Sequence, residues 1–217
     1  MNIAVFIFTA AVAAGLAYWP LLGWREPSIL RAIFKTLPVA LLATASLVGG
    51  GPHFLTIALA LSALGDWFLA FKGERNFIGG LVAFLLAHLA YCALFFVNQD
   101  PGWTQGAWFF AGAVLVMALV LGVRRVLRPH LGKMRIPVSV YCGVIAAMAV
   151  AALSRGPDPV LLAGVALFLA SDMVLAFETF VFGEGSQNRR WSGPVIWYAY
   201  FAGQALIAAA ILFMPLG

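Results

Sequence analysis

The chain has 217 residues, of which 64% are hydrophobic and only 10% charged, and its formal net charge is +5. Soluble domains are about 45–50% apolar and about 25% charged, so the composition excludes a soluble domain, a disordered chain and a disulfide scaffold. The positive charge does not point to nucleic acid, because only 13 basic residues stand against 8 acidic ones. We expect an all-α polytopic membrane protein.

Eight apolar stretches reach the length of about 20 residues that a membrane-crossing helix needs. Turn-forming segments separate them, for example Gly49-Gly50-Gly51-Pro52. The apolar runs are continuous and lack the alternation of β-barrel strands. We predict a single membrane domain over residues 1–217, with transmembrane helices at 3–22, 28–48, 53–71, 77–97, 106–123, 136–154, 158–180 and 194–214.

The basic residues favour one side of this topology. Only Arg155 lies in an even-numbered loop, and the other twelve bases lie in or next to the odd-numbered loops. Cytoplasmic loops carry an excess of Lys and Arg, so we expect a cell-membrane protein with both termini outside (periplasmic) and the basic loops in the cytoplasm. The twelve are Arg25, Arg31, Lys35, Lys72, Arg75, Arg124, Arg125, Arg128, Lys133, Arg135, Arg189 and Arg190.

Two segments that lie 106 residues apart share the pattern D-x-x-L-A-F. One begins at Asp66 and the other at Asp172, and Ser62 and Ser171 lie upstream of them. This offset maps the third predicted span onto the seventh, which runs in the same direction, and it suggests two parallel four-helix repeats. Both aspartates are then expected in the cytoplasmic half of the membrane.

Ionisable residues inside a span indicate function, because a central Asp costs about 2.5–3.5 kcal/mol on the insertion scale. Asp66, His88 and Asp172 are such residues. His88 has a second interpretation, as a core histidine bonded to a carbonyl or hydroxyl group. No spacing of ligands predicts a metal site, and no motif predicts a nucleotide cofactor, so we expect neither.

Polar and aromatic residues follow on the fourth and eighth spans. Tyr91 lies one turn after His88 on the same face, while Tyr200 and Gln204 share a stripe on the last span, with Tyr198 to one side. This stripe is either part of a site or an aromatic packing face with Gln204 as a bond between helices.

The S-x-x-G-D pattern from Ser62 to Asp66, the later Ser171-Asp172 pair and the polar last span resemble the YhhN-like lysoplasmalogenase family of membrane proteins. The resemblance implies hydrolysis of the vinyl ether bond of lysoplasmalogens to a fatty aldehyde and glycerophosphoethanolamine or glycerophosphocholine. It also implies that Asp66 and Asp172 are the catalytic acids and that the substrate is a lysophospholipid in the bilayer.

The chemistry of a vinyl ether suits two carboxyl groups. One carboxylic acid protonates the outer vinyl carbon, and one carboxylate stabilises the resulting cation and activates water, as in glycosidases. Residues expected to bind substrate or support this pair are Ser62, His88, Tyr91, Ser171, Tyr198, Tyr200 and Gln204. Candidates for the headgroup phosphate are Lys72, Arg75, Arg189 and Arg190, unless these bases only set the topology.

Two other classes of function remain open. A lipid or small-molecule transporter also uses buried acids, although helices broken at matching positions are not apparent, because Pro38 and Pro137 lie near span ends. A non-enzymatic lipid-binding protein would not need two buried acids.

Overall fold

The computed structural model describes residues 2–97, 106–182 and 189–214, and within them it contains eight α-helices and no β-strand. The predicted all-α fold with eight helices is confirmed. A π-helical turn, Trp19–Gly23, extends the first helix. In chain order the helices are α1 (Ile3–Tyr18), α2 (Ile29–Val48), α3 (His53–Phe68), α4 (Glu74–Val97), α5 (Ala107–Leu127), α6 (Arg135–Leu153), α7 (Pro159–Phe180) and α8 (Arg189–Phe213).

Seven of these helices, α3 excepted, are long and apolar enough to cross a membrane, so the chain is a multi-pass membrane protein. The third helix, α3, has only 16 residues and ends at Phe68, three residues before the predicted end. It ends there because the amides of Ala70 and Phe71 bond to carbonyls three residues back instead of four.

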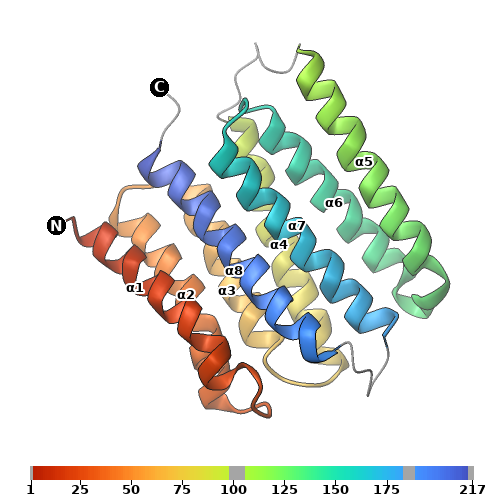
Figure 1. The fold of residues 1–217 in the computed structure, drawn as a ribbon, viewed down its shortest axis with the longest axis horizontal. Helices are drawn as coiled ribbons and strands as arrows, with labels where there is room; N and C mark the ends of the chain where they lie inside the picture. Colours follow the sequence, from red (N-terminus) through yellow and green to blue (C-terminus); the bar gives the residue numbers. More distant parts are fainter. Residues whose placement is uncertain (1, 98–105, 183–188, 215–217) are drawn as a thin grey trace.

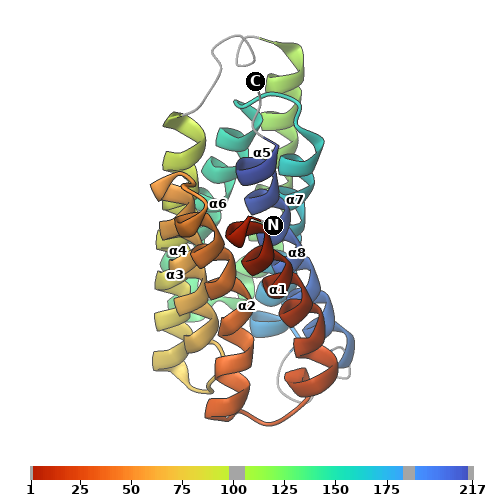
Figure 2. The same ribbon diagram turned by 90° about the vertical axis from the view of Figure 1, so that its left-hand side faces the viewer.

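The helices form a bundle in which neighbours in sequence are mostly neighbours in space (Figure 1). The closest pairs are α7 with α8, α3 with α4, and α1 with α2, while α5 lies at the edge and packs mainly on α6. α1 begins and α8 ends at one end of the bundle, and the connections α1–α2, α3–α4 and α5–α6 lie at the other (Figures 1 and 2). The basic loops that contain Arg25, Lys72 and Lys133 therefore share one end.

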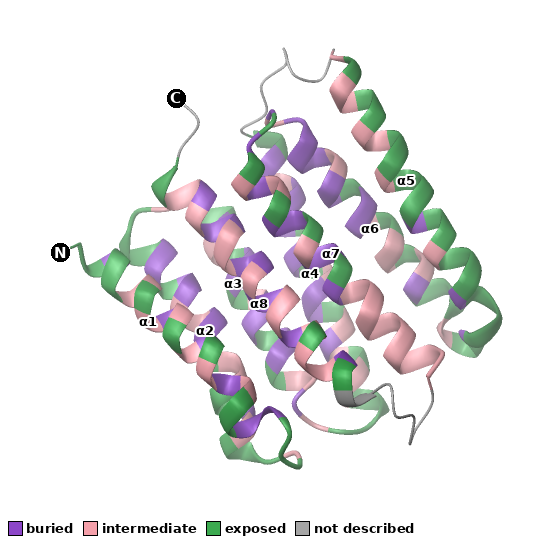
Figure 3. Ribbon diagram, viewed as in Figure 1, coloured by how far each residue is buried: buried purple, intermediate pink, exposed green. Residues whose placement is uncertain are grey.

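The distribution of polarity is that of a protein in lipid. Ser62, Asp66, His88 and Gln204 are at most 2% exposed. Large apolar side chains such as those of Leu115 and Ile136 face outward instead, and α5 is exposed along most of its length (Figure 3). An outer surface this apolar, around a core that contains buried polar residues, has to be surrounded by hydrocarbon or by other protein.

The two internal prolines differ in position. Pro137 is the third residue of α6, as expected, where its missing amide proton would have no partner in the helix. Pro38 lies in the middle of α2 and is buried, so its expected place near a span end is wrong. The helix continues through Pro38 because neighbouring helices pack around it.

The helices α7 and α8 approach each other through glycine. A Cβ atom added to Gly203 would lie 2.8 Å from the carbonyl oxygen of Gly164 and 2.9 Å from the amide nitrogen of Phe168. Only glycine allows backbones to come this close. The contact fixes α8 against α7 and thereby the two helices that carry Tyr200 and Asp172.

Candidate active site

A polar cavity of about 280 Å³ lies among α1, α2, α3, α7 and α8, towards the end of the bundle with the basic loops. Asp66 from α3 and Asp172 from α7 both line it. Asp66 and Asp172 are 106 residues apart in the sequence, and the packing of the helices brings both side chains to the same cavity.

Asp66 is held between a cation and a hydroxyl group. The Tyr200 hydroxyl donates a hydrogen bond to Asp66 Oδ2 at 2.7 Å, and Lys35 Nζ lies 3.9 Å from Oδ1. The side chains of Lys35 and Asp66 are 17% and 3% exposed, so water screens this ion pair only weakly. Lys35, which was expected next to the first loop, lies inside α2 and lines the cavity.

Asp172 has different partners. The Tyr141 hydroxyl donates to Asp172 Oδ2 at 3.0 Å, and His88 Nε2 lies 3.4 Å from the same oxygen. His88 Nδ1 lies 2.6 Å from the Phe84 carbonyl oxygen. Because a carbonyl oxygen only accepts, we assign a proton to Nδ1, which leaves Nε2 as an acceptor that faces Asp172.

A second hydrogen-bonded group lies one helical turn from the Asp66–Tyr200 pair. Gln204 Nε2 donates to Ser62 Oγ at 2.9 Å, and the Tyr91 hydroxyl donates to Gln204 Oε1. Ser62 and Gln204 lie four residues from Asp66 and Tyr200 respectively, on the same faces of α3 and α8. These three residues join α3, α4 and α8 beside the cavity without lining it.

Ser171 and Tyr198, which were also expected at the site, make no hydrogen bond to either aspartate in the described part of the chain. Ser171 lines the cavity, but its hydroxyl donates to the Ile196 carbonyl oxygen at 2.9 Å. Tyr198 bonds to the Leu16 carbonyl oxygen at 3.3 Å and does not line the cavity.

Of the four candidate phosphate ligands, Lys72 and Arg75 do not line the cavity. Lys72 pairs with Glu26 at 3.2 Å while 80% exposed, and Arg75 is exposed on the outside of the bundle. The side chains of Arg189 and Arg190 lie outside the described residues. Arg31 and Lys35 of α2 are the bases that line the cavity in the described part of the chain.

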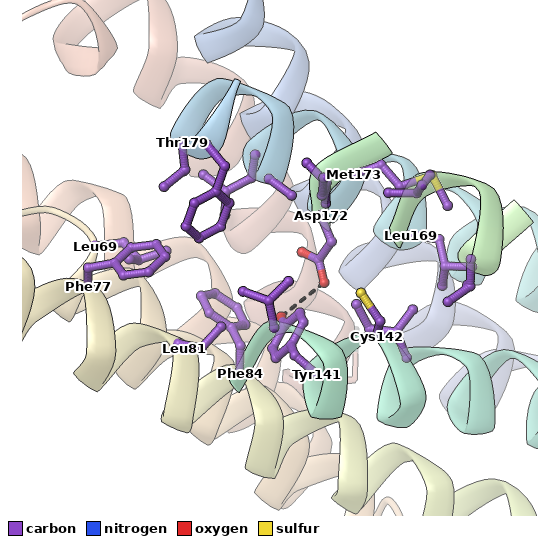
Figure 4. Close-up of a pocket in the computed structure, with 18 residues that line it drawn as sticks. Leu69, Phe77, Leu81, Phe84, Tyr141, Cys142, Leu169, Asp172, Met173 and Thr179 are labelled. Atoms are coloured by element: carbon purple, nitrogen blue, oxygen red, sulfur yellow. Dashed lines mark hydrogen bonds between the residues drawn. The ribbon is translucent and has the colours of Figure 1, made fainter. Parts of the chain in front are cut away.

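An apolar pocket of about 70 Å³ adjoins the polar cavity (Figure 4). It lies among α4, α5, α6 and α7 and is walled mostly by aliphatic and phenyl side chains. The Asp172 carboxylate points into it beside Tyr141 (Figure 4). Leu69, Phe84, Asp172 and Leu175 line both spaces, so Asp172 lies where the polar cavity meets the apolar pocket.

Tyr141 and the role of Lys35 were missed by the sequence analysis. Lys35 had a detectable signal, because it follows Arg31 by four residues on one face of an otherwise apolar span. Tyr141 had none, because only the packing of α6 on α4 and α7 brings it to Asp172. Among the described residues, no three His, Cys, Asp or Glu side chains are grouped closely enough to hold a metal ion.

Comparisons with known proteins place the chain in a family. It is 35% identical over 194 residues to the lysoplasmalogenase of Mycobacterium bovis and equally to that of Mycobacterium tuberculosis, covering 86% of this chain and 72% of each relative. It is 28% identical over 202 residues to lysoplasmalogenase TMEM86A of Bos taurus, covering 84% and 78%. No solved structure matches the chain. The YhhN family profile matches residues 30–211, and the chain therefore belongs to the YhhN family.

Proposed function

We propose that this protein is a lysoplasmalogenase, a membrane hydrolase that cleaves the vinyl ether bond of lysoplasmalogens. The names of its relatives support the substrate class. The observation that carries the proposal is that two carboxyl groups, those of the buried Asp66 and the partly buried Asp172, line one cavity inside the bundle. Vinyl ether hydrolysis requires an acid and a stabilising carboxylate, and this cavity supplies both.

The different partners of the two aspartates divide the roles between them. The Lys35 ammonium group beside Asp66 favours the ionised carboxylate. Asp172 faces Nε2 of His88, which carries no proton in this tautomer and can accept a hydrogen bond from a protonated Asp172 carboxyl group, and Asp172 borders the apolar pocket. We therefore assign Asp172 as the acid and Asp66 as the carboxylate that stabilises the cation and activates water.

In the first step Asp172 transfers its proton to the outer vinyl carbon, and the electron pair of the double bond forms the new C–H bond. The inner carbon becomes an oxocarbenium ion beside the Asp66 carboxylate. Water then adds to this carbon while Asp66 accepts a water proton, and the product is a hemiacetal.

The hemiacetal collapses with the protons moving back. Its hydroxyl group returns a proton to Asp172, the bond from the inner carbon to the glycerol oxygen breaks, and Asp66 protonates the departing oxygen. The products are a fatty aldehyde and a glycerophospho-alcohol. One water is consumed, both carboxyl groups recover their starting states, and no cofactor takes part.

The two adjoining spaces suit the two halves of a lysoplasmalogen. The vinyl ether joins a polar glycerophosphate to an apolar chain, and Asp172 lies where the polar cavity adjoins the apolar pocket. The pocket, at about 70 Å³, holds only the carbons nearest the vinyl ether, and the rest of the chain extends into the bilayer.

Aldehyde release by the purified protein in detergent tests the proposal. A lysoplasmalogen should yield a fatty aldehyde, and the saturated alkyl-ether lysolipid should bind without reacting, because it has no double bond to protonate. Equal turnover of an ordinary acyl lysolipid would indicate an esterase. If the folded wild-type protein releases no aldehyde, the result would favour the alternative function of a transporter, because transporters also contain buried acids.

A further inference from the structure

One corner of the polar cavity presents hydrogen-bond donors that lack acceptors. Tyr18, at the end of α1, is 2% exposed, and Arg31, in the first turn of α2, is half-buried. The Tyr18 hydroxyl lies next to the Arg31 guanidinium group. In the described part of the chain, neither the Tyr18 hydroxyl nor Arg31 Nε has a hydrogen-bond partner.

Buried donors without acceptors are rare, because each one loses its bonds to water without replacement. Arg31 Nη2 donates to the Gly23 carbonyl oxygen over a long distance of 3.4 Å. Several guanidinium donors and the Tyr18 hydroxyl therefore remain for a ligand, and an Arg guanidinium pairs best with a carboxylate or phosphate.

Three acids line the cavity, Asp66, Asp172 and Glu178, and none of them pairs with Arg31 or Tyr18 in the described part of the chain. Glu178 accepts a hydrogen bond from the Ser192 hydroxyl. Asp66 is engaged by Lys35 and Tyr200, and Asp172 by Tyr141 and His88. The corner lies at the end of the bundle with the basic loops, whereas the apolar pocket lies on the other side of Asp172. A lysolipid whose vinyl ether is at Asp172 would extend its phosphate in this direction.

We infer that Arg31 and Tyr18 form the phosphate site for the headgroup of a lysophospholipid, with Arg31 as the charged ligand and Tyr18 as a neutral donor. This inference rests on the proposed function for the identity of the lipid. It replaces Lys72 and Arg75 as the bases that contact the headgroup, since both lie outside the cavity.

Binding of a lipid that the enzyme cannot hydrolyse tests this site. The probes are a hexadecyl-ether lysophosphocholine, hexadecylglycerol, which lacks the phosphate, and inorganic phosphate. Trp19 and Trp197 line the cavity, so their fluorescence in detergent reports the titration. Arg31→Gln should weaken binding of the lysophosphocholine about tenfold or more, the usual effect of losing a charge-assisted hydrogen bond.

Tyr18→Phe is the more conservative second variant. It removes a hydroxyl that bonds to no described residue, so the fold should be unaffected while binding of the lysophosphocholine weakens several-fold. Hexadecylglycerol should bind both variants as it binds the wild type, which also shows that they are folded. Arg125→Gln removes an exposed base far from the cavity and should change neither titration.

Three outcomes would overturn the inference: unchanged lysophosphocholine binding by both variants, a loss caused by Lys72→Gln instead, or inorganic phosphate that binds as tightly as the lipid. Phosphate-dependent binding without aldehyde release would support this site and contradict the proposed hydrolase. Aldehyde release by the wild type, together with unaltered lysophosphocholine binding by both variants, would support the proposed hydrolase and contradict this phosphate site.

Discussion

The two site aspartates have similar sequence contexts and different chemical surroundings. Asp66 pairs with a cation, Lys35, and accepts from Tyr200. Asp172 faces the imidazole of His88 and accepts from Tyr141. Two carboxyl groups in different environments can hold different protonation states, which is the usual basis for dividing acid and base roles.

Asp66→Asn and Asp172→Asn should each lower the rate of aldehyde release by about 10²–10⁴-fold, the usual effect of losing a general acid or base. Asparagine keeps the shape and removes the titrating group. The matched control is Glu26→Gln, an exposed carboxylate paired with Lys72, which should keep full activity. Full activity in both aspartate variants would exclude the two-carboxylate mechanism.

The dependence of the rate on pH should be bell-shaped. At low pH the carboxylate that stabilises the cation takes up a proton, and at high pH the acid loses its own, so the rate falls on both sides. The two limbs belong to the coupled pair and not to single residues. His88→Gln removes the ring that faces Asp172 and should displace the alkaline limb more than the acid one. Unperturbed carboxyl groups titrate near pH 4, so a catalytic carboxylic acid should lose its proton, and the rate should fall, within the range above that pH. A rate that stays constant between about pH 4 and 10 would therefore contradict this assignment.

At the level of helices, the site depends on how closely α7 and α8 pack. Glycine at positions 164 and 203 lets the backbones of α7 and α8 approach closely, and α8 carries the Tyr200 and Gln204 side chains that bond to Asp66 and Ser62. The short α3 brings Asp66 near its own C-terminal end, where the chain turns at Leu69. The end of α3 therefore lies at the cavity and brings the Asp66 carboxylate there. A longer apolar span would not place a polar group at this position.

Gly203→Ala should destabilise the bundle. Its new methyl group would press on backbone atoms of Gly164 and Phe168, which cannot turn aside, and overpacking of this kind costs about 1–3 kcal/mol. The control is Gly122→Ala on α5, where a new Cβ meets nothing within 4 Å. Thermal unfolding in detergent should show a lower Tm for the first variant only, and equal Tm values would show that α7 and α8 can separate slightly without loss.

The whole molecule has an apolar outside, a mostly apolar core that encloses a polar cavity, and bases concentrated at one end. Two of the twelve bases assigned to that side, Arg31 and Lys35, belong to the cavity, and the remaining asymmetry against Arg155 still favours this end as cytoplasmic. We propose on this basis that the cavity lies in the inner half of the cell membrane and that the termini face outward.

Cysteine labelling in intact cells tests the orientation. In a variant without Cys92 and Cys142, a cysteine at position 130 should react only with a membrane-permeable thiol reagent, and one at position 102 should also react with an impermeable reagent. His130 is exposed in the connection between α5 and α6. The opposite pattern would reverse the orientation and place the cavity in the outer half.

The amino-acid sequence by itself determined the class of the protein, the number of helices and the two central acids. Apolar runs separated by turns predict helices in lipid because backbone groups there must bond within the segment. Charged residues such as Asp66 and Asp172 stand out in such runs because hydrocarbon makes them costly. These signals are local in the chain, and so they can be read without knowing how the helices pack.

Tertiary structure alone decided which residues meet. The pairing of Lys35 with Asp66 depends on the packing of α2 against α3, and the contact of Tyr141 with Asp172 depends on the packing of α6 beside α7. The position of Asp172 between a polar and an apolar space likewise depends on all eight helices, which together line the two spaces. A continuous apolar run indicates that a helix lies in lipid. Because lipid is as apolar as the helix surface, the run does not specify which helix packs against which. That packing follows from shape and from hydrogen bonds between helices, which no single segment contains.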